Sequence, residues 1–155
     1  MRVTICAVGR LRPGPERDLV ADYLQRFERT GRPLGLGPAQ VLEVEDRKGG
    51  GMAAEAALLG RAIPAGAVIC ALDERGETPD SPAFAGWLAG WRDAGQAPAF
   101  VIGGADGLDP ALRGRAARLL SFGPMVWPHL LVRVMLAEQL YRAATILAGT
   151  PYHRA

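Results

Sequence analysis

Short apolar runs alternate with helix-like patterns along this chain, and this alternation constrains its fold more than any other feature. Strands are expected at residues 3–8, 41–44, 67–72, 99–102 and 119–122. Apolar residues recur at helical spacing over residues 16–29, 52–63, 81–94 and in a final segment that ends near residue 148. Ser81 is the expected N-cap of the third helix, and Asp109 is expected to cap a short helix that begins at Pro110. The pattern predicts an α/β fold with a mostly parallel sheet and helices on both faces.

The length and composition indicate one ordinary globular unit. The chain has 155 residues, so a single domain over residues 1–155 is expected. Apolar residues make up 49% and charged residues 22%, and no apolar run reaches the roughly 18 residues of a membrane span. Residues 1–5 have the pattern of a first strand and not that of a signal peptide. We therefore expect a cytoplasmic protein.

The cysteines and the charges exclude some classes of site. Cys6 and Cys70 lie in apolar runs, so we expect small buried thiols, and no set of about four ligands suggests a metal site. The net charge of +2 is too small to indicate nucleic-acid binding. Lys48 is the only lysine, so the basic side chains are almost all arginine, which suits bidentate contacts with phosphate.

Glycine-rich turns follow the third, fourth and fifth expected strands. They cover residues 72–76, 103–107 and 123–128. Ligands in parallel sheets bind beyond the carboxyl ends of strands, and glycines let a backbone approach a ligand closely. A single such turn is explained by the need to reverse the chain, whereas three neighbouring ones favour a shared pocket. The glycine pattern of dinucleotide folds and the Walker phosphate loop are both absent.

The final helix and the tail behind it carry the remaining candidate residues. The helix is apolar nearly all round, which either a partner subunit or a central core position explains. Glu138 and Arg142 lie one turn apart in the favourable order for an ion pair. His129 precedes the helix, and Arg133 follows it by one turn. These two residues and Tyr152, His153 and Arg154 together offer guanidinium groups, a stacking ring and a proton acceptor. Their spacing does not establish that they meet.

Four motifs in order carry a resemblance to a known family. They are Leu72-Asp73-x-x-Gly76, then Ile102-Gly103-Gly104-x-x-Gly107-Leu108, then Pro128-His129-x-x-Val132-Arg133 with Glu138 to Arg142, and finally Pro151-Tyr152-His153-Arg154. This series resembles the family of ribosomal RNA large subunit methyltransferase H, the pseudouridine N3-methyltransferases of the SPOUT superfamily. The resemblance spans the whole chain and is most specific from Gly123 onward.

The resemblance implies a fold, a cofactor and a partner. The implied fold is an α/β sheet with a deep trefoil knot in the C-terminal half, and the implied assembly is a homodimer. The knot loops of the family bind S-adenosylmethionine, and the implied substrate is a pseudouridine in a stem-loop of large-subunit ribosomal RNA. In this sequence the cofactor-binding residues are Leu72, Gly103, Gly104, Gly123, Pro124, Met125, Val126, Trp127 and Pro128.

The resemblance also implies residue roles at the target side of the pocket. His129, Arg133 and Arg142 are assigned to RNA binding, and Glu138, Tyr152, His153 and Arg154 to catalysis. Glu138, His153 and water all stay open as the acceptor of the N3 proton. Asp106 departs from the family pattern, because many relatives carry a glutamate there, and Leu130 and Leu131 also differ from some relatives.

Two other functions stay open. One is a non-catalytic ribosome- or RNA-binding protein that keeps the same fold, and the other is a different nucleotide-dependent α/β enzyme. Binding of S-adenosylmethionine separates both from the methyltransferase hypothesis.

Overall fold

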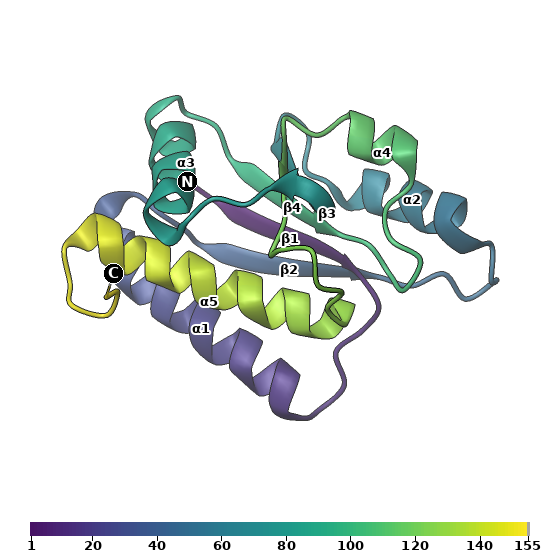
Figure 1. Cartoon of the computed structure of the whole chain (residues 1–155), viewed down its shortest axis with the longest axis horizontal. Helices are drawn as coiled ribbons and strands as arrows, with labels where there is room; N and C mark the ends of the chain where they lie inside the picture. The colour runs from purple at the N-terminus through teal and green to yellow at the C-terminus, as the bar shows by residue number, and fades with distance from the viewer. Residues whose placement is uncertain (155) are drawn as a thin grey trace.

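A five-stranded parallel sheet forms the centre of the molecule (Figure 1). The computed structural model describes residues 1–154. The strands are β1 (Val3–Val8), β2 (Ala39–Val44), β3 (Val68–Glu77), β4 (Pro98–Ile102) and β5 (Arg118–Leu120), and their order across the sheet is β2-β1-β4-β3-β5. Every neighbouring pair is parallel. The alternation in the sequence therefore predicted the fold class correctly.

Helices cover both faces of this sheet. On one face lie α1 (Pro15–Gly31), α3 (Ser81–Asp93) and α5 (His129–Ala148), and on the other lie α2 (Gly51–Ala62) and α4 (Pro110–Gly114). A short 3₁₀ turn, η1 (Arg32–Leu34), follows α1. Helices α1 and α5 run side by side in Figure 1 and pack closely together. Strand residues alternate between the two cores, so Ile5 faces α1, α3 and α5, whereas Cys6 faces α2 and α4.

Helix α5 packs against α1, α3 and β4. Five of its apolar residues are at most 1% exposed, namely Leu136, Ala137, Leu140, Ala143 and Ala144. Contacts within one chain therefore account for much of its apolar surface. Leu131, near its first turn, is 39% exposed and stays outside this core.

Strand β3 differs from its expected form. The sequence predicted a strand that ends at Leu72 and a polar turn after it, but β3 continues to Glu77. Both Leu72 and Glu77 pair with Leu120 of β5, so the residues between them bulge out of the ladder. An Asp73 carboxylate oxygen accepts a 2.8 Å bond from the Arg75 amide and shapes this bulge. The polar segment is thus an interruption inside a longer strand, which periodicity does not reveal.

Two helix starts test the capping assignments. Asp80 caps α3 by accepting a 2.8 Å bond from the Ala83 amide, so the assignment of Ser81 as N-cap was wrong by one residue. Ser81 is the first helical residue, and its hydroxyl donates to Gln139 of α5 instead. Asp109 caps α4 as expected, through a 2.8 Å bond from the Ala111 amide.

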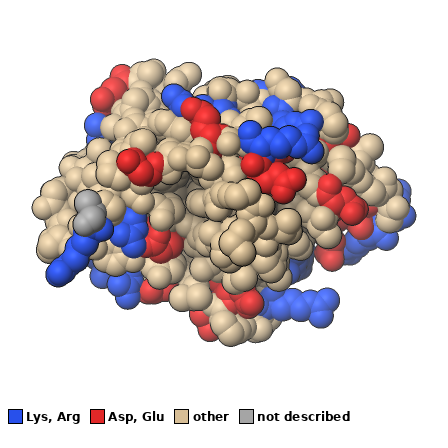
Figure 2. All heavy atoms as spheres, viewed as in Figure 1, with Lys and Arg blue, Asp and Glu red and all other residues tan. Residues whose placement is uncertain are grey.

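The surface carries mixed charge. On the face seen in Figure 2, the Lys and Arg side chains are interspersed with Asp and Glu, in keeping with the small net charge of +2. Among the described residues, no helix is long and apolar enough to cross a membrane.

Candidate functional site

The three glycine-rich turns line one cavity at the carboxyl edge of the sheet. The bulge of β3, the turn after β4 and the segment after β5 all border it, and the first residues of α5 close one side. Its volume is about 480 Å³, within the range of small-molecule sites. Seven of the nine residues assigned to cofactor binding line this cavity: Leu72, Gly103, Gly104, Gly123, Met125, Val126 and Trp127. Pro124 and Pro128 are not among its lining residues.

Close backbone packing explains the glycines of the turn after β4. A Cβ atom on Gly103 would lie 2.6 Å from the carbonyl oxygen of Gly107. A Cβ on Gly104 would lie 2.8 Å from Oε2 of Glu55, and Gly107 adopts a φ of +82°. The turn therefore folds back on itself at Gly103, where the backbone of Gly107 leaves no room for a side chain, and it presents backbone to the cavity.

The segment after β5 forms an open wall. The Ser121 hydroxyl and Gly123 exchange hydrogen bonds of 3.0 and 3.2 Å, and Gly123 has a φ of +105°. Beyond that turn, Met125 and Val126 are 71% and 86% exposed. The amides of Met125, Val126 and Trp127 make no hydrogen bond to any of residues 1–154. They are available to a ligand with hydrogen-bond acceptors.

Charged side chains line the β3 end of the cavity. Asp73 is 8% exposed, and its carboxylate lies 3.5 Å from Arg113 of α4 and 3.8 Å from Arg75. Glu55 stands behind Gly104, and burial raises the pKa of this carboxyl, with Asp106 and Asp46 raising it further.

Arg113 and Met52 were missing from the sequence-based site. Each comes from a separate helix, and no motif marked them.

The residues His129 and Arg133 have different surroundings, although they lie one turn apart. His129 lines the cavity together with Val132. Arg133 is 0% exposed and donates to Glu43 at 2.7 Å, to the Val8 carbonyl at 3.2 Å and to the Gly9 carbonyl at 3.0 Å. The assignment of Arg133 to RNA binding does not fit this position. Its guanidinium joins α5 to the ends of β1 and β2, and it has no surface to offer to RNA.

The tail residues form a second cluster, on the C-terminal half of α5. One carboxylate oxygen of Glu138 accepts bonds from Arg142 at 2.7 and 3.1 Å and from the Tyr152 hydroxyl at 2.9 Å. Arg142 also lies 3.2 Å from Nδ1 of His153 and stacks over the Tyr152 ring at 4.8 Å. The pKa of Tyr152 is raised to about 12, first by burial and then by its bond to Glu138. Arg154 is exposed.

This tail cluster does not line the cavity. His153 borders a separate hollow of about 580 Å³, together with Gln139 and the start of α3. Residues 120–123 border both hollows and therefore stand between them. The five residues that were grouped from the sequence thus occupy three places in one chain: His129 lines the cavity, Arg133 is buried, and the other three lie in the tail.

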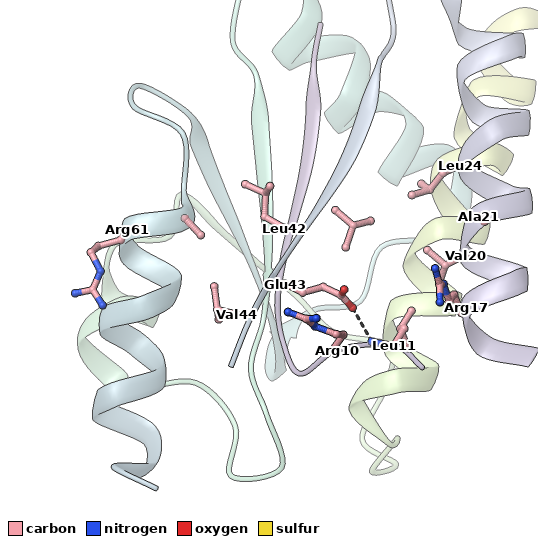
Figure 3. A pocket seen from close by; sticks show the side chains of 12 residues that line it. Arg10, Leu11, Arg17, Val20, Ala21, Leu24, Leu42, Glu43, Val44 and Arg61 are labelled. Atoms are coloured by element: carbon pink, nitrogen blue, oxygen red, sulfur yellow. Dashed lines mark hydrogen bonds between the residues drawn. The ribbon is translucent and has the colours of Figure 1, made fainter. Parts of the chain in front are cut away.

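A larger hollow of about 950 Å³ runs along the free edge of β2, between α1 and α2 (Figure 3). Arg10 and Arg17 lie on one side of it and Arg61 on the other. The Glu43 carboxylate, drawn in Figure 3 with its 2.7 Å bond from the Leu11 amide, also holds Arg133. This hollow lacks the converging glycine turns, so we assign the functional site to the smaller cavity.

The chemistry of the smaller cavity suits a nucleoside-sized ligand. Its walls combine apolar side chains such as Leu72, Ile102 and Val132 with free backbone amides and the paired Asp73 carboxylate. Apolar surface suits a flat base, and backbone amides suit its ring nitrogens or a carboxylate.

Known proteins with a similar sequence or fold carry methyltransferase names. A family model described as "Predicted SPOUT methyltransferase" matches residues 1–153. Proteins named "Ribosomal RNA large subunit methyltransferase H" from Dinoroseobacter shibae and Cereibacter sphaeroides are 76% and 73% identical, each with 99% of both chains covered. A probable methyltransferase from Bordetella pertussis has a similar fold, with a TM-score of 0.56 at 16% identity over 92% of this chain and 94% of that one. The chain therefore belongs to the SPOUT methyltransferase family.

Proposed function

We propose that this protein methylates N3 of a pseudouridine in large-subunit ribosomal RNA, with S-adenosylmethionine as the methyl donor. SPOUT methyltransferases use this donor, and full-length relatives at 76% and 73% identity carry the name of a large-subunit ribosomal RNA methyltransferase. The observation that carries the proposal is the single cavity into which the bulge of β3 and the turns after β4 and β5 converge. Ribosomes are the substrate, so we place the enzyme in the cytoplasm.

The cavity residues have distinct roles in this proposal. The bound donor supplies a sulfonium-activated methyl group. The turn from Gly103 to Gly107 and the amides of residues 125–127 hold the donor in a fixed orientation, and Leu72 packs against it. Orientation of this kind lowers reaction barriers by roughly 7–11 kcal/mol in favourable cases. No step requires a metal.

The target side of the site is assigned to His129 and to the tail cluster. Arg142, Tyr152, His153 and Arg154 offer charge and a stacking ring to the RNA. Glu138 orients this cluster, because three hydrogen bonds already occupy one of its oxygens. Arg133 has a structural role in this scheme.

We further propose that two copies assemble and that the C-terminal half is knotted. Met125, Val126, Trp127 and Leu131 are 71%, 86%, 41% and 39% exposed around the cavity, which suits a surface covered by a second copy. In such a dimer, the tail cluster of one copy can reach the cavity of the other copy, although it does not line the cavity of its own chain. The chain passes from α4 on one face of the sheet to α5 on the other, which is compatible with a knot.

Donor binding and methyl transfer test the proposal separately. Calorimetry with S-adenosylmethionine is expected to give saturable binding that Gly103→Val abolishes. Labelled donor and ribosomes from cells lacking the protein are expected to give one methylated pseudouridine, identified by mass spectrometry of digested RNA. Binding of ribosomes without transfer would support the non-catalytic alternative, and a chain that does not bind the donor would contradict the proposal. Sedimentation is expected to give the molecular mass of a dimer.

A further inference from the structure

His129 is the only imidazole that lines the cavity. It occupies the first position of α5, and its ring packs against the end of β1, where a Cβ on Gly9 would lie 3.5 Å from its Cε1 atom. Neither ring nitrogen has a hydrogen-bond partner within residues 1–154. Nδ1 is buried, whereas Nε2 is not, so Nε2 is the ring nitrogen that is available to a bound substrate.

The charged groups around His129 are engaged with one another. Arg133, on the same helix, is held by Glu43 and by the carbonyls of Val8 and Gly9. Asp73 is paired with Arg113 and Arg75 across the cavity. Glu74 and Asp106 also line the cavity and are exposed. Water hydrates the charged form of an exposed carboxylate, so such a group is a weak proton acceptor.

The two groups first considered as proton acceptors are less suited to the task. The Glu138 oxygen Oε1 already accepts bonds from Arg142 and Tyr152, and His153 lies 3.2 Å from the Arg142 guanidinium, so both are engaged within the tail cluster. Neither lines the cavity of its own chain, whereas His129 does.

We propose that His129 is the proton acceptor of the methyl transfer, an inference that rests on the function proposed above. The proton leaves N3 of the base for a ring nitrogen of His129. The N3 electron pair forms the new bond to the methyl carbon, and the electron pair of the broken carbon–sulfur bond stays on sulfur as a neutral thioether. The imidazolium of His129 then releases its proton to water.

The surroundings of His129 keep it in the form that this role requires. Burial lowers the pKa of His129, and the nearby Arg133 guanidinium lowers it further. The imidazole is therefore neutral at pH 7 and carries a free electron pair. Single-turnover transfer is expected to rise with pH below the ordinary value of 6.5 and then to level off, because only the neutral ring accepts a proton.

Replacement of His129 by alanine tests the proposal. The His129→Ala variant is expected to bind S-adenosylmethionine with unchanged affinity in calorimetry and to transfer the methyl group about 10²–10⁴-fold more slowly at pH 7. The acidic limb of its pH profile disappears, and added imidazole restores part of the rate in proportion to its neutral form. The variant His153→Asn is the matched control, because it lowers the rate and keeps the acidic limb.

Measurements on the protein without donor or RNA provide an independent readout. An NMR titration of the His129 ring, assigned by comparison with His129→Gln, is expected to give a pKa below 6.5. Full single-turnover rate in His129→Ala, an unchanged acidic limb, or no response to imidazole would each overturn the assignment and leave the proposed function standing. A wild-type enzyme that binds ribosomes and donor without transfer would overturn the proposed function itself.

Discussion

At the scale of single residues, the site depends on backbone contacts that side chains would prevent. Gly103 has no positive φ, yet a Cβ there would lie 2.6 Å from the backbone of Gly107. The requirement for glycine therefore comes from the close approach of two backbone segments. The sequence marked the residue, and only the folded turn gives the reason.

Gly103→Ala is expected to destabilise the protein by about 1–3 kcal/mol, because the turn must open to admit the methyl group. Donor affinity is expected to fall with it, since the same turn lines the cavity. Urea unfolding and calorimetry measure the two effects. Gly86→Ala is the control, because Gly86 is exposed on helix α3 and a Cβ there meets nothing within 4 Å. This variant is expected to raise the free energy of unfolding by up to about 1 kcal/mol. Equal behaviour of the two variants would contradict the argument.

The buried guanidinium of Arg133 gives a second prediction. Arg133→Met removes the buried partner of an ion pair whose other side chain, Glu43, is 29% exposed, and it leaves the Val8 and Gly9 carbonyls without their donor. We expect a loss of about 1–3 kcal/mol in the free energy of unfolding, mainly from the unsatisfied carbonyls. Arg26→Met breaks an exposed pair with Asp22, whose side chains are 50% and 49% exposed, and is expected to cost at most about 1 kcal/mol. A small effect of Arg133→Met would show that the interior tolerates its loss.

At the scale of elements, helix starts and the docked tail carry separable functions. Helix α3 begins at a carboxylate cap, and the tail after α5 is bound by side chains of that same helix. The cap stabilises the helix, and the tail is proposed to act in the reaction, so their variants are expected to differ in which measurement they change.

Asp80→Ala is expected to lower the free energy of unfolding by about 1 kcal/mol, because the Ala83 amide loses its acceptor. Asp80→Asn keeps a capping oxygen and is expected to restore most of that loss. Chemical denaturation of the two variants measures the difference. If asparagine were as damaging as alanine, the capping role of Asp80 would be refuted.

Removal of residues 152–155 is expected to spare donor binding and to abolish methyl transfer. Neither Tyr152 nor His153 lines the donor cavity, whereas both belong to the cluster assigned to the RNA. Calorimetry and the ribosome assay separate the two effects. Tyr152→Phe removes only the hydroxyl bond to Glu138 and is expected to reduce the rate partially. Full activity of the truncated enzyme would contradict the assignment of the tail.

At the scale of the whole molecule, each of the two cysteines lies in one of the two hydrophobic cores, which pack on opposite faces of the sheet. Cys6 packs in the core beneath α2 and α4, and Cys70 packs in the core beneath α1, α3 and α5. Burial raises the pKa of Cys6 to about 11 and that of Cys70 to about 12. Both thiols are free and buried, as the sequence predicted.

We expect neither thiol to react with a disulfide reagent at pH 8 until the sheet opens, because reaction requires an accessible thiolate. In Cys6→Ala and Cys70→Ala, the remaining thiol reports on one core at a time. If the remaining thiol reacts equally slowly with the reagent in both variants, the two cores open together. Fast reaction of one thiol would contradict unfolding as a single cooperative unit. The pKa of each thiol is higher in the folded protein than its ordinary value of 9. The contribution of the protonated thiols to the free energy of unfolding is therefore complete below pH 9 and is lost as the pH rises through 11 and 12.

The amino-acid sequence by itself determined the local features of this protein. Strand and helix periodicity, capping carboxylates and glycine turns depend on neighbouring residues, so the fold class, the cap at Asp109 and the turns after β4 and β5 could be predicted. The expected turn after Leu72 is instead a bulge inside β3, because β3 pairs with β5 on both sides of it. The tertiary structure decided what depends on residues far apart in the chain. It placed Arg133 inside against Glu43, left His129 in the cavity without a partner among residues 1–154, and separated the tail cluster from the cavity of its own chain. Helix spacing places His129 and Arg133 on the same side, and only the bonds from Arg133 to the ends of β1 and β2 explain why His129 alone of the two lines the cavity.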